Sequence, residues 1–353
     1  MRAFGCPKCG KAVGFEVQRC PTCATAVGYH YPSRQMLALS GQADVIVDER
    51  RWVSCAHWTR GCNWLTSCDS GSDRCFADSF VRRGPAADDA KALAELDDTL
   101  KTLRRLIFQL IELGLPVRPY YQADDGLAFD LLSSESSGGP VTIGHADGVI
   151  TIDLAESLEL YRERLRIHFK EPYRTMLGHF RHEVGHYYEM ILVQDTALAE
   201  DARAFFGDER EDYQAALQRH YRGVVPAGWQ SSYISEYATA HPWEDFAESF
   251  AHYLHITGTL ATIADSGLVL QARRVKWDLE TDIDARESYA DATIADIVGD
   301  WIPLSGVLNR VNHSMGRGDL YPFSLPPRVV DKLGFIHRVV TTTAAGHAGV
   351  TQN

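Results

Sequence analysis

All eight cysteines of this 353-residue chain lie between residues 6 and 75. Four of them form two Cys-x-x-Cys pairs, Cys6 with Cys9 and Cys20 with Cys23. In such a pair a tight turn brings two thiolates to one metal ion, and two pairs complete a tetrahedral site. We expect these four cysteines to hold a structural zinc ion. Two neighbouring Cys-x-x-Cys pairs supply the four ligands of a metal site, whereas a redox function would need only one pair. Metal binding would then drive the folding of the N-terminal region.

The other four cysteines, Cys55, Cys62, Cys68 and Cys75, are spaced more loosely and contain no Cys-x-x-Cys pair. Two interpretations stay open. Cys55, Cys62 and Cys75 would hold a second structural zinc ion together with either Cys68 or Asp78, since aspartate can also bind zinc. Alternatively, the four are small buried thiols.

A second pattern lies far from the cysteines, at His182-Glu183-Val184-Gly185-His186. Apolar residues recur at helical spacing around it, and Pro172 suits the first turn of a helix. On a helix His182 and His186 share one face, so that both imidazoles can bind one zinc ion. Glu183 lies one step round the helix and can reach a water molecule at the metal. This H-E-x-x-H arrangement is typical of metal-assisted amide hydrolysis.

A zinc site of this kind needs a third protein ligand and an open position. The segment from His241 to Tyr253 contains Glu244 and Glu248, which would project from one face of a helix that begins near Pro242. One carboxylate would bind zinc and the other would accept the outward N–H of a ligand histidine. The alternative is a solvated acidic face.

These motifs resemble the gluzincin metallopeptidases, which include the thermolysin and lethal-factor types. Longer strings, EPYRTMLGHFRHEVGHYY, HPWEDFAESFAHYLH, ITIDLAES and CNWL, resemble a bacterial group of zinc-binding metallopeptidases with an N-terminal zinc ribbon. The resemblance implies that Glu244 is the third zinc ligand and that Glu248 supports a ligand histidine. It also implies that Tyr237 donates to the oxyanion of the reaction, and that strand 149–154 is an edge strand that pairs with the substrate. The last point competes with an interior hairpin strand.

The predicted fold class is α+β, a zinc ribbon followed by a mainly helical zincin-like domain with a small β-sheet. We expect the zinc-ribbon region at 1–85, the metallopeptidase domain at 86–340 and a disordered tail at 341–353. Helices are predicted at 88–113, 155–168, 278–303 and 326–340. Strands are predicted at 127–132 and in a hairpin at 141–154.

Charge and hydropathy limit the partners. The formal net charge is −12, which argues against broad nucleic-acid binding, although residues 1–85 carry 11 Lys and Arg against 7 Asp and Glu. No apolar run approaches the roughly 20 residues that a membrane-spanning helix needs, and the N-terminus has no apolar signal segment. We therefore expect a cytoplasmic protein with a peptide or protein substrate, and a protein partner for the zinc ribbon.

Four further histidines are candidates for lesser roles. His179 shares the face of His182 and His186, but a fourth protein ligand would close the site, so we expect it to support the site instead. His252 and His255 are predicted to be packing residues. His241 is interpreted either as a helix N-cap or as a donor to the substrate.

The function predicted from sequence is zinc-dependent peptide hydrolysis with Glu183 as the general base. It requires one catalytic and one structural zinc ion, and a second structural ion if Cys55 to Cys75 form a site. The alternatives are a zincin fold that no longer cleaves and acts as an adaptor for protein or nucleic acid, and a purely structural metalloprotein. The presence of Glu183 favours the active enzyme over both alternatives, because a site that no longer catalyses hydrolysis does not need a general base.

Overall fold

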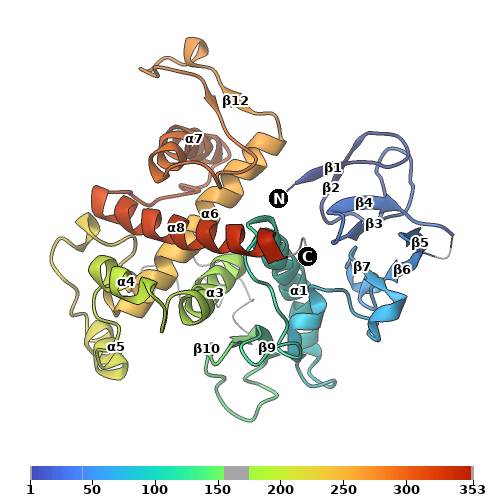
Figure 1. Cartoon of the computed structure of the whole chain (residues 1–353), viewed down its shortest axis with the longest axis horizontal. Helices are drawn as coiled ribbons and strands as arrows, with labels where there is room; N and C mark the ends of the chain where they lie inside the picture. The colour runs from blue at the N-terminus through green and yellow to red at the C-terminus, as the bar shows by residue number, and fades with distance from the viewer. Residues whose placement is uncertain (1, 42, 155–174, 351–353) are drawn as a thin grey trace.

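The computed structural model describes residues 2–41, 43–154 and 175–350. Short strands form the N-terminal region, and helices form most of the rest. In Figure 1 the blue N-terminal strands gather on one side of the molecule and the helices from α3 (Met176–Leu192) to α8 (Pro327–Val350) on the other, with α1 (Ala90–Glu112) between them. The predicted α+β class, a mainly helical domain with a small sheet, is confirmed.

The N-terminal region consists of short antiparallel strand pairs. They are β1 (Ala3–Gly5) with β2 (Ala12–Gly14), β3 (Val27–His30) with β4 (Gln35–Ala38), and β6 (Arg50–Ser54) with both β5 (Asp44–Val47) and β7 (Leu65–Ser67). An aromatic cluster fixes them to α1. The ring of Phe15 lies 4.5 Å from that of Phe108 in α1, and Tyr29 lies 4.8 Å from Trp64. Tyr29 and Trp64 are fully buried, so the region shares its core with α1.

A four-stranded sheet has the order β10-β11-β9-β8, formed by β10 (Gly144–Ala146), β11 (Val149–Asp153), β9 (Ala128–Leu132) and β8 (Val81–Arg83). β9 runs parallel to both of its neighbours, and β10 and β11 form the predicted antiparallel hairpin. The expectation of an edge strand at 149–154 is wrong, because the hairpin and the parallel pairing with β9 occupy both sides of β11. β10 forms that edge instead.

The two helices expected to carry the motif residues are α3 and α6 (Pro242–Asp265), and they pack against each other. α3 begins after Thr175, whose hydroxyl accepts a hydrogen bond from the N–H of Gly178 at 3.0 Å. α6 begins with Pro242, where the missing N–H costs nothing. His241 precedes it as the N-cap, and its Nδ1 accepts from the N–H of Trp243. Of its two interpretations, the structure supports the cap.

Further elements of the described chain are α4 (Leu198–Phe206), α5 (Tyr213–Tyr221), the 3-10 turn η6 (Tyr237–Thr239), β12 (Val269–Leu270), β13 (Ile283–Asp284) and α7 (Ile294–Ser314). α4 and α5 lie between the two motif helices along the chain. Across the described ranges, no helix is long and apolar enough to cross a membrane.

Three predicted segments differ from the observed elements or lie outside the described residues. The helix expected at 155–168 lies outside the described residues. The helix expected at 278–303 is wrong at both ends, because Thr293 and Asp296 form a capping box that starts α7 at Ile294, and α7 continues through Pro303 to Ser314. Disorder expected from residue 341 differs from the structure, in which α8 continues to Val350. Val340, the residue just before this segment, is buried and packs α8 against the core.

Candidate metal centres

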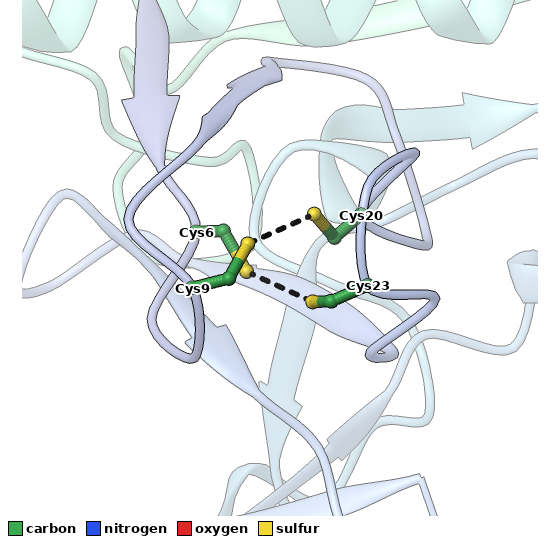
Figure 2. Close-up of side chains that lie close together, drawn as sticks. All are labelled: Cys6, Cys9, Cys20 and Cys23. Atoms are coloured by element: carbon green, nitrogen blue, oxygen red, sulfur yellow. Dashed lines mark hydrogen bonds between the residues drawn. The ribbon is translucent and has the colours of Figure 1, made fainter.

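The four cysteines of the two N-terminal pairs meet at one point (Figure 2). The Sγ atoms of Cys6 and Cys23 are 3.7 Å apart, and so are those of Cys9 and Cys20. Two thiolates on one tetrahedral zinc ion, each at about 2.3 Å, lie about 3.8 Å apart. A disulfide would require about 2.05 Å. The arrangement therefore fits a shared metal ion and not a pair of disulfides.

Each pair is closed by a backbone hydrogen bond, from Gly10 N to Cys6 O and from Ala24 N to Cys20 O, both at 2.9 Å. The residue after each pair has the left-handed conformation, with φ of 70° at Gly10 and 59° at Ala24. Glycine adopts this conformation freely, whereas alanine does so at a cost. The turn geometry thus brings both thiols of a pair to one side of the loop.

A second cluster joins Cys55, Cys62, Cys75 and Asp78, whose ligand atoms all lie within 4.8 Å of one another. The Sγ atoms of Cys62 and Cys75 are 3.7 Å apart, and Cys55 Sγ lies 3.5 Å from Asp78 Oδ2. All four residues are buried. Cys68 is exposed and lies outside this cluster. Of the two candidates for the fourth ligand, the structure brings Asp78 into place.

Asp78 is held by a histidine and an arginine that sequence reasoning missed. Its Oδ2 lies 2.8 Å from His57 Nδ1, and its Oδ1 accepts from Arg104 of α1 at 3.0 Å. Asp78 is completely buried and Arg104 is nearly so. A buried carboxylate requires such compensation. The same contact raises the pKa of His57, because the carboxylate favours the charged imidazole. No sequence spacing links residues 78 and 104, so only the fold reveals the pair.

The histidine motif and Glu244 form a third cluster between α3 and α6. The Nε2 atoms of His182 and His186 are 3.2 Å apart, and Glu244 Oε2 lies 3.1 Å from the first and 3.5 Å from the second. Ligand atoms about 2.0–2.1 Å from one tetrahedral zinc ion would lie about 3.4 Å apart. Glu244 Oε2 is buried and has no hydrogen-bond partner among the described residues. This triangle fits a zinc ion.

Two side chains position two of these three groups, His182 and Glu244. Glu248 Oε1 accepts from His182 Nδ1 at 2.7 Å, which directs Nε2 toward the centre of the triangle. Tyr213 of α5 donates its hydroxyl to Glu244 Oε1 at 2.6 Å, so that Oε2 faces the histidines. Burial opposes a charged His182, but the carboxylates of Glu244 and Glu248 outweigh it and raise its pKa well above the usual value. Tyr213 was not found from sequence, because it lies 31 residues before its partner.

The close approach of α3 and α6 depends on Gly185, the fourth residue of the motif. A Cβ atom at this position would lie 2.8 Å from Cα of Ala247 and 3.0 Å from its carbonyl oxygen. Only glycine, facing a small partner, allows the helix backbones to come this near. The contact lies between the two histidines along α3 and beside Glu244 along α6, so it determines their separation.

Glu183 is buried, with 5% of its surface exposed. Its Oε1 lies 3.2 Å from Nε2 of His179, and its Oε2 is buried without a hydrogen-bond partner in the described part of the chain. Burial raises its pKa, but His179, His182 and His186 outweigh this effect and lower it. Glu183 is therefore an ionised carboxylate beside the triangle. His179 contacts Glu183, in keeping with a supporting role.

Tyr237 lies in η6, with its ring 5.8 Å from the ring of His182. Burial raises the pKa of its phenol well above the usual value, so the hydroxyl keeps its proton. On its other side, 5.7 Å away, lies the ring of His220 from α5. The Nδ1 atom of His220 is buried and has no partner among the described residues. Sequence reasoning missed His220, because no motif marks it.

His252 and His255, the last two of the four histidines with predicted lesser roles, lie in the core. His252 Nδ1 is 2.8 Å from the hydroxyl of Tyr321, and His255 Nδ1 is 3.4 Å from Arg181. Both side chains are buried. Burial lowers the pKa of His252 to about 4 and that of His255 to about 2, so both are neutral near pH 7. Their surroundings agree with the predicted packing roles.

Comparison with known proteins bears on this geometry. Residues 93–339 match the family model described as "Putative zinc-binding metallo-peptidase". The chain belongs to this metallopeptidase family. Residues 3–89 match a zinc-ribbon domain model, so the predicted N-terminal zinc ribbon is confirmed. The ribbon model spans both cysteine clusters, and the peptidase model spans His182, His186 and Glu244.

Similar proteins occur in mycobacteria. An uncharacterized protein from Mycobacterium tuberculosis and one from Mycobacterium bovis are each 42% identical to this chain over 347 residues, which is 98% of this chain and 96% of the relative. No solved structure matches. The relatives' names state no substrate, so any finer assignment depends on the residues themselves.

Proposed function

We propose that this member of the metallopeptidase family hydrolyses peptide bonds as a gluzincin, with zinc held by His182, His186 and Glu244. The single observation that carries the proposal is the triangle of two Nε2 atoms and one Oε2 atom, 3.1–3.5 Å apart, with the buried carboxylate of Glu183 beside it. A solvated acidic face does not explain Glu244, because its Oε2 is buried and has no hydrogen-bond partner among the described residues.

Bound zinc would polarise the scissile carbonyl group and make water a better nucleophile near neutral pH. The other steps belong to the chain. Glu183 takes the proton of the attacking water and later gives it to the leaving nitrogen. Tyr237, which keeps its proton, donates to the oxyanion that develops on the carbonyl oxygen, a contact of a kind worth about 3 kcal/mol in other hydrolases. Glu248 holds His182 in the tautomer that leaves Nε2 free.

We further propose that both cysteine clusters hold structural zinc, one through Cys6, Cys9, Cys20 and Cys23, and one through Cys55, Cys62, Cys75 and Asp78. None of the eight cysteines forms a disulfide. Thiolate sites of this kind persist where thiols stay reduced, which favours the cytoplasm as the working compartment. A peptide or protein is the substrate, and the ribbon is a surface for a protein partner.

The test is the Glu183→Gln variant. Since Glu183 does not belong to the metal triangle, the variant should retain the full zinc content of the wild type but lose hydrolysis of a denatured protein mixture, measured by labelling newly formed N-termini. Glu200→Gln, an exposed change in α4, serves as the control and should retain both. Cleavage by the Glu183→Gln variant at the wild-type rate would refute the general base. If the zinc-loaded wild type itself cleaves nothing, the adaptor function is the better explanation.

A further inference from the structure

A cavity of about 330 Å³ lies between α1, α3, α6, α8 and the N-terminal region. The volume falls within the range of small-molecule sites, about 300–1,000 Å³. α3 contributes Leu177 and Arg181 to its wall, whereas none of His182, His186 and Glu244 lines it. The cavity is therefore separate from the proposed peptidase site, although it uses the same two helices.

The charged side chains that line this cavity are mostly cationic. They comprise the four arginines Arg2, Arg34, Arg105 and Arg181 and the two carboxylates Glu112 and Glu287. Arg2 and Arg34 share one carboxylate, since they lie 2.7 Å and 3.5 Å from the oxygens of Glu112. Two guanidinium groups on one carboxylate leave a net positive charge. Both side chains are partly exposed, at 37% and 50%, so they can accept an anion from solvent.

The rest of the wall is largely apolar. Phe108 contributes from α1, Leu113 from the position just after it, Leu177 from α3, and Val340 and Ala344 from α8. On α6 the wall is formed by two small residues, Ala261 and Gly258, and the absence of a side chain at Gly258 makes room for the amide of Gln109. A ligand that fits must therefore combine an apolar body with an anionic group.

The floor of the cavity is preorganised. Gln109 accepts from Nε and Nη2 of Arg181 at 3.1 and 2.9 Å, and its own amide donates to the carbonyl of Leu254 in α6. These bonds join α1, α3 and α6 behind the open space. Because these bonds fix the spacing of the three helices, the cavity is already present before a ligand binds.

We propose that this cavity binds a small amphiphilic carboxylate, with its head group against Arg2 and Arg34 and its apolar body between α1, α6 and α8. The head group exchanges the weak 3.5 Å contact of Arg34 with Glu112 for a direct ion pair. The apolar body removes the partly exposed surfaces of Leu113 and Leu177 from water. The inference does not depend on peptidase activity, and binding is measured without it.

The experiment uses the zinc-loaded full chain and three probes with the same alkyl chain: decanoate and decylamine below their micelle concentrations, and decanol below its solubility limit. Isothermal titration calorimetry should show decanoate binding at one site and more tightly than decanol by tenfold or more, which is the gain expected of a charge-assisted contact. Decylamine should bind least. Decanoate should also raise the unfolding temperature in proportion to its occupancy.

Two variants and one control localise the site. Arg34→Gln should weaken decanoate binding about tenfold without changing decanol binding. Ala261→Phe should fill the cavity and abolish both. Arg51→Gln is the matched control, since Arg51 is equally exposed and ion-paired but lies outside the cavity, and it should bind as the wild type does. Equal affinities for decanoate and decylamine, absence of decanoate binding, or unchanged binding in Ala261→Phe would each overturn the proposal.

Discussion

Replacing Gly185 by alanine should separate the zinc ligands without touching any of them. The added Cβ would lie 2.8 Å from Cα and 3.3 Å from Cβ of Ala247. Nonbonded carbon atoms prefer about 3.5–4.0 Å, so α3 and α6 must move apart by roughly 1 Å. The obstructing atoms belong to the backbone and to a methyl group, and no flexible side chain can yield.

The metal site tolerates less movement than this. Zinc–ligand distances are held to about 0.2 Å, so a shift of roughly 1 Å removes most of the bond to Glu244. Loss of a supporting contact alone weakens metal binding about 10- to 100-fold, and loss of a ligand should exceed that. Stability should change less, because overpacking costs about 1–3 kcal/mol while the helix gains about 1 kcal/mol from alanine.

The assay is competition with a zinc chelator, which measures the affinity of the most weakly bound zinc ion. Thermal unfolding measures stability alongside it. Gly299→Ala in α7 is the matched control, because a Cβ there meets nothing within 4 Å. That variant should gain about 0.5–1 kcal/mol and bind zinc unchanged. If Gly185→Ala retains wild-type zinc affinity and is stabilised as Gly299→Ala is, the helix separation does not control the metal site and the reasoning is refuted.

Three further predictions concern metal and pH. Glu244→Ala should release the zinc of the catalytic site, whereas Glu248→Ala should weaken its binding about 10- to 100-fold; equal retention in metal titrations would contradict these roles. Elemental analysis should give three zinc ions per chain, and Cys62→Ser should remove one of them while Cys68→Ser removes none. The His252 pKa of about 4 lies below its unfolded value, so its stabilising effect is complete above pH 6.5 and is lost as pH falls toward 4. The free energy of unfolding, measured with urea, should therefore fall between pH 7 and pH 5 by about 2 kcal/mol less in His252→Phe than in the wild type. An identical pH dependence in both proteins would count against a buried neutral imidazole.

The sequence identified the parts of this protein whose chemistry is local. The two Cys-x-x-Cys pairs and the H-E-x-x-H pattern each place their proposed ligands within one turn or one helix, so spacing alone brings the groups together. Helix α3 and the hairpin of β10 and β11 were predicted near their observed positions for the same reason. Glu244 and Glu248 were paired correctly on one helix, but their assignment came from a family resemblance.

Tertiary structure decided whatever depends on contacts between distant segments. Asp78, and not Cys68, lies with Cys55, Cys62 and Cys75, where Arg104 and His57 compensate its buried charge. Tyr213 turns Glu244 toward the histidines from a separate helix. Pairing with β9 made β11 an interior strand, because a strand's position in a sheet depends on its neighbours and not on its own residues. Buried polar side chains need hydrogen-bond or ionic partners, and these come from segments that are distant in sequence. No sequence pattern could therefore predict which residues the partners are.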